Sequence, residues 1–212
     1  MKRSIIFAFM VCIMSGLIGP SYAKETFVSI KIGPTWPHDQ LNSDHPTSWD
    51  GELLYGTFID RKVGFGIAGD FLWNTNTVVK DSVIGGAHQK WAAREEGTYM
   101  FPVMGFLVFD PIPNAVVHPM LRFEIGYNSL LYYLKIRDAD TTQIPTSNNG
   151  YYNGLIVKIG VDGLYNLGEQ TAIFAGLEYQ WANTTTNQNA EGFFSQLDMS
   201  GVGIRMGFRF LL

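Results

Sequence analysis

The carboxyl-terminal stretch Val202–Leu212 reads V-G-I-R-M-G-F-R-F-L-L. Every second residue, counted back from the end, is apolar: Leu212, Phe210, Phe208, Met206, Ile204 and Val202. The residues between them include Gly203, Arg205, Gly207 and Arg209. A two-residue period is that of a β-strand whose two faces meet different surroundings. One face of this strand suits lipid, and the other, which carries two arginines, does not.

The same alternation recurs along the chain. It predicts seven further strands over Thr26–Gly33, Trp49–Ile59, Val63–Trp73, Thr98–Phe109, Val116–Asn128, Tyr151–Val161 and Thr171–Trp181. Long and short connections alternate between them, and Asn74–Gly97 and Ser129–Gly150 are two of the long loops. Pro102 falls within a strand, so we expect a β-bulge there, because a closed barrel has no free edge that tolerates proline.

The amino terminus has the features of a secretory signal. Lys2 and Arg3 precede an apolar run, and Ser21-Tyr22-Ala23 supplies small residues where a signal peptidase cleaves. We expect residues 1–23 to be a cleaved signal peptide and residues 24–212 to form one β-barrel domain. The full chain has 15 basic and 19 acidic residues; removal of Lys2 and Arg3 leaves a net charge of −6, which argues against a nucleic-acid partner.

The distribution of charge indicates which face of the strands is outside. The polar faces carry Lys31, Glu52, Asp70, Arg122, Glu124, Lys158, Glu178, Arg205 and Arg209. A Lys or Arg that faces lipid near the bilayer midplane costs about 2–4 kcal/mol. A soluble, lipocalin-like barrel would instead turn its apolar faces inward, but side chains this large would overfill an eight-stranded interior. We therefore predict an all-β, eight-stranded, antiparallel up-and-down transmembrane barrel.

The predicted strands, and above all the closing strand Val202–Leu212, resemble small bacterial outer-membrane β-barrel proteins of the OmpX and OmpA-transmembrane-domain type. The resemblance covers the whole predicted mature chain and rests on pattern, not on a local motif. It implies short periplasmic turns, long extracellular loops and a location in the outer membrane. It also implies contact with outer-membrane lipid and lipopolysaccharide, and recognition of Val202–Leu212 by the barrel-assembly machinery.

Two groups of residues are candidates for a site in the lumen. The charged group is Arg122, Glu124, Lys158, Glu178 and Arg205, which we expect to form an internal ion-pair network with a structural role, the alternative being a polar path or gate for a small solute. The apolar group is Leu72, Met100, Met104, Phe106, Met120 and Phe174. These residues either pack the lumen or line a pocket like that of OmpW-like proteins, which carry hydrophobic molecules.

An enzymatic role is the third hypothesis. His38 and His45 lie in the first outer loop near Ser48, but the His-Ser spacing of the outer-membrane lipid deacylases is absent. We expect His118 to bond to the backbone or to Glu124. The histidine spacing matches no metal motif. We therefore expect a protein without catalytic activity, metal or cofactor, and we expect it to be a monomer. Its long loops would have a structural or surface-interaction role. The alternatives are a narrow conduit for small or hydrophobic solutes and a lipid-modifying enzyme.

Overall fold

A computed structural model describes residues 25–38, 47–84, 87–113, 115–136, 146–186 and 196–212. The predicted signal peptide lies outside these residues and stays a prediction. The described strands are β1 (Glu25–Pro37), β2 (Ser48–Phe58), β3 (Val63–Ile84), β4 (Ala87–Phe109), β5 (Val117–Ile136), β6 (Thr146–Asn166), β7 (Thr171–Thr185), β8 (Gln196–Asp198) and β9 (Gly201–Leu211). Within the same residues, no helix has the length and apolarity needed to cross a membrane.

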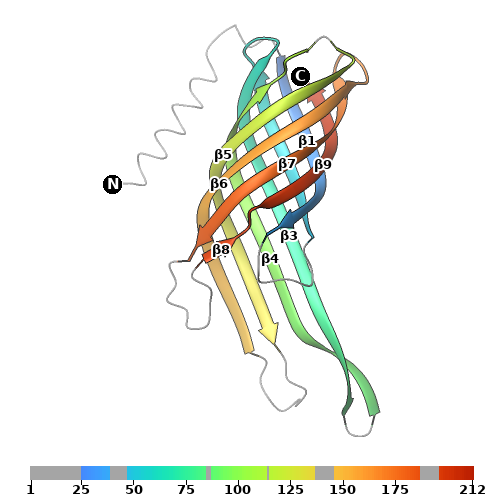
Figure 1. Cartoon of the computed structure of the whole chain (residues 1–212), viewed down its shortest axis with the longest axis vertical. Helices are drawn as coiled ribbons and strands as arrows, with labels where there is room; N and C mark the ends of the chain where they lie inside the picture. The colour runs from blue at the N-terminus through green and yellow to red at the C-terminus, as the bar shows by residue number, and fades with distance from the viewer. Residues whose placement is uncertain (1–24, 39–46, 85–86, 114, 137–145, 187–195) are drawn as a thin grey trace, which may run out of the picture.

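Eight of the strands close into a barrel (Figure 1). From β1 to β7 each strand pairs antiparallel with the next, and β9 pairs with both β7 and β1. The three-residue strand β8 pairs with the end of β7 and takes no part in the closure. The predicted eight-stranded, antiparallel up-and-down barrel is therefore confirmed. Closure gives every barrel strand two neighbours and removes the sheet edge.

The alternation of side chains is resolved with the polar faces inside. On β2, Leu53 and Tyr55 are more than half exposed, whereas Glu52 and Leu54 on the other face are 2% and 1% exposed. Lys158 on β6 is fully buried, while the neighbouring Ile159 is exposed. The arrangement with apolar faces inward is thereby excluded. Small inward residues and charged side chains share a narrow interior, as an eight-stranded barrel requires.

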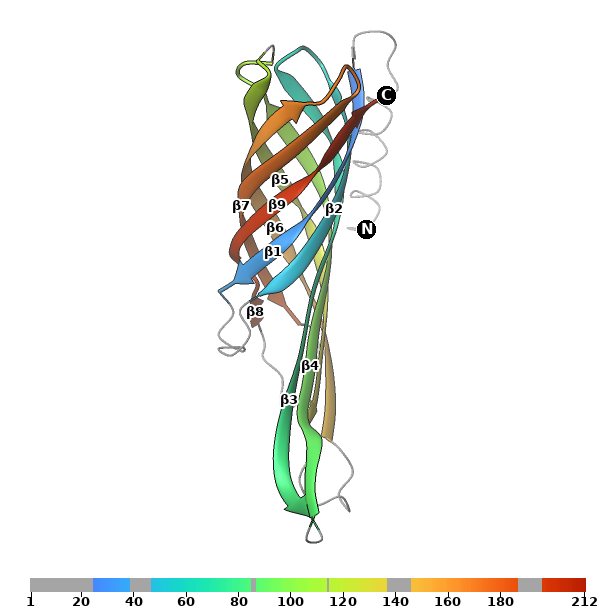
Figure 2. The same cartoon turned by 90° about the vertical axis from the view of Figure 1, so that its right-hand side faces the viewer.

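The described residues of the two segments that we predicted as loops, Asn74–Gly97 and Ser129–Gly150, are in strands instead. β3 and β4 pair as far as Ile84 and Ala87, with a register shift between Val78 and Val79, and β5 continues to Ile136 opposite Thr146 on β6. Neither segment alternates as a barrel strand does: the continuations of β3 and β4 carry polar residues on both faces, and residues 130–134 of β5 are apolar or aromatic at every position. The four strands project beyond the ends of β1, β2 and β7 as a sheet (Figure 2).

The bulge expected at Pro102 is absent. The β3–β4 register is the same on both sides of it, with Gly69 opposite Val103 and Leu72 opposite Met100. Pairing is interrupted only at the residues between these pairs, while Pro102 stays in register with Asn128 on β5. Because proline has no N–H, the backbone pairing with β3 is lost locally at Pro102. The strand contains no extra residue there, so there is no bulge.

The seam between β1 and β9 depends on a close approach of the two backbones. Their register runs from Phe27–Leu211 to Ile32–Met206 and resumes at Thr35–Gly203. Between these stretches, a methyl group on Gly33 would lie well inside van der Waals contact of the Ile204 carbonyl oxygen. Only glycine leaves room for the backbones at this point.

The turn after β2 is stabilised by a carboxylate at the end of the barrel where the carboxyl terminus lies. Asp60 Oδ1 accepts the backbone N–H groups of Lys62 and Val63, both at 2.7 Å. These two hydrogen bonds hold the pKa of the exposed Asp60 carboxyl below its ordinary value. The ionised side chain therefore closes the turn as an Asx motif.

Candidate functional site

Charged side chains from β1, β2, β3, β5, β6, β7 and β9 meet inside the barrel. The cations are Lys31, Arg122, Lys158 and Arg205, and the carboxylates are Asp50, Glu52, Asp70, Glu124, Asp162 and Glu178. All of them are less than a tenth exposed. Charges this deeply buried are tolerated only when they are paired or hydrogen-bonded.

Glu178 on β7 is the centre of this charged layer. Its carboxylate lies 2.6 Å from Arg122 Nη2, 2.7 Å from Arg205 Nη2 and 3.2 Å from Lys158 Nζ. These three cations come from β5, β9 and β6. One carboxylate thus contacts cations from three strands and links the closing strand β9 to β5 and β6.

Arg122 contacts four carboxylates. Its Nε lies 2.5 Å from Glu124, and its Nη groups lie 2.6 Å from Glu178, 3.2 Å from Asp162 and 3.6 Å from Glu52. An arginine is suited to this position, because its planar group offers five N–H donors in several directions.

The remaining pairs connect the first three strands to the layer. Lys31 Nζ lies 2.9 Å from Glu52. Lys158 contacts Asp70 and is 3.6 Å from Asp50. Arg205 contacts Asp50 and donates to Thr35 Oγ1 at 2.7 Å.

All five residues of the predicted network therefore lie in one connected layer. The prediction missed Lys31, Asp50, Glu52, Asp70 and Asp162 as members. Alternation does place these five on inward faces, and that signal was available. Their partners were not, because Lys158 and Asp70 are 88 residues apart and meet across the lumen.

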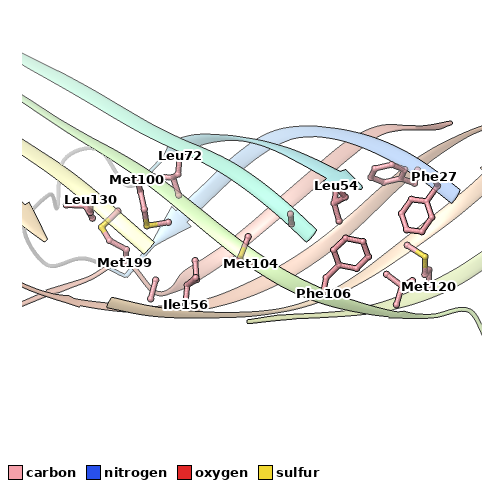
Figure 3. Packing of buried hydrophobic residues seen from close by; sticks show 14 of the residues in the cluster. Phe27, Leu54, Leu72, Met100, Met104, Phe106, Met120, Leu130, Ile156 and Met199 are labelled. Carbon is pink, nitrogen blue, oxygen red and sulfur yellow. The ribbon is translucent and has the colours of Figure 1, made fainter. Parts of the chain in front are cut away.

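The six predicted apolar residues are all buried and belong to one hydrophobic cluster, but they are spread along the length of the lumen and do not line a single pocket. Leu72 and Met100 lie beside Leu130 and Met199, whereas Phe106 and Met120 lie beside Phe27 at the other end (Figure 3). On β3 the inward residue between Leu72 and Ala68 is Asp70, which belongs to the charged layer. The lumen is thus filled by apolar side chains on both sides of a charged middle.

The histidines do not form a catalytic arrangement in the described part of the chain. The exposed His38 donates its backbone N–H to the Ser200 carbonyl at 2.6 Å, and its ring contacts the Tyr179 ring. His45 lies outside the described residues. His118 Nδ1 lies 2.5 Å from Asp110 Oδ2, so the expected partner, the backbone or Glu124, is wrong. The reason is the turn after β4, which brings Asp110 back over the start of β5.

No metal-binding group of three or more His, Cys, Asp or Glu occurs among the described residues. The carboxylates of the charged layer instead face lysine and arginine side chains, which neutralise them directly. The layer can hold the strands together, and it can exclude solutes from the lumen.

The chain matches no protein-family model and no curated protein. Among solved structures it is similar to a major outer membrane protein from Thermus thermophilus, with a TM-score of 0.53, 13% identity, and coverage of 88% of this chain and 99% of that one. It is also similar to Ail, the attachment invasion locus protein of Yersinia pestis, with a TM-score of 0.51, 17% identity, and coverage of 88% and 97%. At these identities the likeness shows the fold alone: the chain has the fold of small outer-membrane β-barrels, as its sequence pattern predicts.

Proposed function

We propose that the protein is an integral outer-membrane β-barrel that contacts partners outside the cell through its projecting sheet and has no catalytic activity. The observation that carries the proposal is the extension of β3, β4, β5 and β6 beyond the rest of the barrel (Figure 2). A barrel that served only to fill the membrane would not need strands of 20–23 residues, since about 9–11 suffice to cross it.

The outward face supports the membrane location. Exposed residues around the barrel wall are apolar on every barrel strand, for example Ile30, Leu107 and Leu177, each more than half exposed. Trp49 and Trp181 are 50% and 46% exposed near the ends of β2 and β7 that adjoin the projecting sheet. Aromatic residues at this height are typical of the interface between lipid and water.

The projecting sheet has two edges that can accept a partner strand. No strand of the described residues pairs with residues 75–84 of β3 on the side away from β4, or with residues 146–152 of β6 on the side away from β5. Unpaired N–H and C=O groups along such edges are templates for strand addition by another chain. We expected Asn74–Gly97 and Ser129–Gly150 to contact partners as loops. In this proposal they contact partners through the unpaired edges of their strands.

The lumen supports a structural role for the charged layer. Glu178, Arg205 and Lys158 are at most 3% exposed. Across the lumen, Lys158 contacts Asp70 on β3 and Arg205 contacts Asp50 on β2. A conducting path would require these pairs to separate. Planar-bilayer recording of the purified protein should therefore show no discrete conductance steps, and regular steps would favour the narrow-conduit alternative.

The proposal extends to the partners that the fold requires. The outward face would contact lipid and lipopolysaccharide, and the strand Val202–Leu212 would present its alternating apolar side chains to the barrel-assembly machinery. We propose a monomer, because closure leaves the barrel wall without an edge for a second copy.

Epitope insertion tests the orientation and exposure of the sheet. A tag between Gly85 and Gly86, in the connection from β3 to β4, should be labelled by antibody on intact cells. The same tag between Arg61 and Lys62, in the turn at the opposite end, should be labelled only after permeabilisation. Labelling of both tags, or of neither, on intact cells would contradict the proposed orientation.

Shortening the hairpin of β3 and β4 then tests the interaction. Cells that produce the full chain should adhere to plates coated with fibronectin, laminin or collagen better than cells whose chain lacks residues 77–94. A shift in gel migration on boiling shows whether the shortened barrel still folds. Equal adherence by the two folded proteins to all three coatings would count against the projecting sheet as the contact surface.

A further inference from the structure

A cavity of about 310 Å³ opens at the end of the barrel opposite the projecting sheet. It is bounded by residues of three short turns, among them Arg61, Pro113 and Gly168. Its lining includes the buried polar side chains of Arg209 and His118 and the apolar side chain of Leu164. This volume is at the lower end of the range of small-molecule sites, which is about 300–1,000 Å³.

Arg209 is unlike the other arginines of the lumen. Its Nε donates to Ser29 Oγ at 3.1 Å, its Nη1 lies 3.2 Å from Met120 Sδ, and its Cζ lies 4.5 Å from the centre of the Phe27 ring. All of these partners are neutral. Among the described residues no carboxylate lies within ion-pair distance of Arg209. Arg122 and Arg205, in contrast, each contact at least two carboxylates.

The burial of Arg209 makes this lack of a counter-ion important. The residue is only 5% exposed, and it lines the cavity. Asp162 and Asp110 act on Arg209 only from beyond ion-pair distance. A buried guanidinium that no carboxylate contacts loses hydration without regaining it from an anion. An anion in the cavity would supply that charge and accept the remaining N–H groups.

His118 is a second polar group on the cavity wall. Its Nδ1 is held by Asp110, whose other oxygen accepts the Ile112 N–H at 3.1 Å within its own turn. The imidazole is therefore fixed in orientation. Its Nε2 is buried and has no hydrogen-bond partner among the described residues. The cavity thus combines an uncompensated cation with an unused polar atom.

We propose that this cavity is a binding site for a small monocarboxylate with an apolar body, of about the size of benzoate. The carboxylate would pair with Arg209, and the apolar body would pack against Leu164 and Ala172, both of which are at most 5% exposed. A dianion such as phosphate fits less well, because the cavity offers one uncompensated cation and Asp110 carries a negative charge nearby. Arg61, Glu25 and Glu169 at the rim are exposed, so solvent and salt screen their effect.

The test is to titrate the full chain, in zwitterionic detergent, with benzoate. Binding is measured from the changes in the protein's NMR chemical shifts. Benzamide is the matched neutral probe, because it has the same size and shape without the charge. A ligand of this size should bind with a Kd of about 1 mM. Benzoate should bind at least tenfold more tightly than benzamide, and the shifts should saturate.

Three variants locate the site. Arg209→Gln should weaken benzoate binding about tenfold or more, and Ala172→Leu should do the same by filling the cavity without removing charge. Lys62→Gln removes a cation next to Arg61 in the same turn, at a residue that does not line the cavity, and should leave the affinity within about twofold. Migration on unboiled gels shows whether each variant is folded, and Ala172→Leu keeps the test valid if Arg209→Gln does not fold.

Three results would overturn the proposal. The first is the absence of saturable benzoate binding. The second is equal affinity for benzoate and benzamide, which would indicate simple partition into detergent or an apolar cavity. The third is unchanged affinity in folded Ala172→Leu, which would place the binding elsewhere. None of these results bears on the projecting sheet, so the two proposals fail independently.

Discussion

Replacing Glu178 by glutamine removes one negative charge from the centre of the charged layer and keeps the shape of the side chain. Arg122, Lys158 and Arg205 each lose a carboxylate at 2.6–3.2 Å. Breaking a buried ion pair costs about 3–5 kcal/mol. Because each cation keeps at least one other carboxylate, we expect a loss of unfolding free energy near the lower limit, about 3 kcal/mol.

Asp70→Asn is the matched control for Glu178→Gln. It makes the same change of charge in the same layer, but Lys158 is the one cation that the Asp70 carboxylate contacts among the described residues. Lys158 keeps Glu178 and Asp50 in this variant, and Asp50 loses a like-charged neighbour. We expect a cost of about 1 kcal/mol, the size of one hydrogen bond.

Urea unfolding in lipid vesicles, followed by tryptophan fluorescence, measures both variants. A stability of about 5–15 kcal/mol leaves either variant folded in buffer. The reasoning fails if Glu178→Gln costs no more than Asp70→Asn, because the two differ in the number of cations contacted and not in charge. It also fails if both variants unfold at the urea concentration of the unaltered protein.

Three further expectations concern the closure of the barrel and its turn end. The purified protein should migrate differently in detergent gels before and after boiling, because a closed barrel resists the detergent; the absence of a shift, with recovery from the soluble periplasm, would refute the barrel. Gly33→Ala should slow or prevent folding into vesicles, since its methyl group would meet the Ile204 carbonyl, whereas Gly69→Ala, which meets no atom within 4 Å, should fold normally; equal folding yields would contradict the close seam. Asp60→Asn should lower the free energy of unfolding at neutral pH and not at strongly acidic pH. The pKa of Asp60 is lower in the folded state than its ordinary value of 3.8. The carboxylate therefore contributes its full stabilisation above pH 3.8, and this stabilisation is lost as the pH falls through the folded-state pKa. A pH-independent difference in urea midpoint would show that the charge of Asp60 does not close the turn.

The alternation of apolar and polar residues was sufficient to predict the barrel, its strand number and the inward face. Side chains of a strand point to opposite faces with a period of two, and only a closed sheet satisfies every backbone group in lipid. The same rule put Arg122, Glu124, Lys158, Glu178 and Arg205 in the lumen. It failed for the projecting sheet, because neither the polar continuations of β3 and β4 nor the unbroken apolar run at residues 130–134 of β5 shows a two-residue alternation.

Only the tertiary structure decided which charges are paired. Alternation shows whether a side chain points into the lumen or toward lipid. Its height along the barrel axis is set by the shear of the barrel, and two side chains can pair across the lumen only at the same height. This is why Lys158 contacts Asp70, and why Arg205 has carboxylate partners while Arg209, four residues later on the same strand, has none among the described residues. The sequence determined by itself that these arginines point inward; closure of β9 onto β1 and β7 placed one in the charged layer and the other beside a cavity.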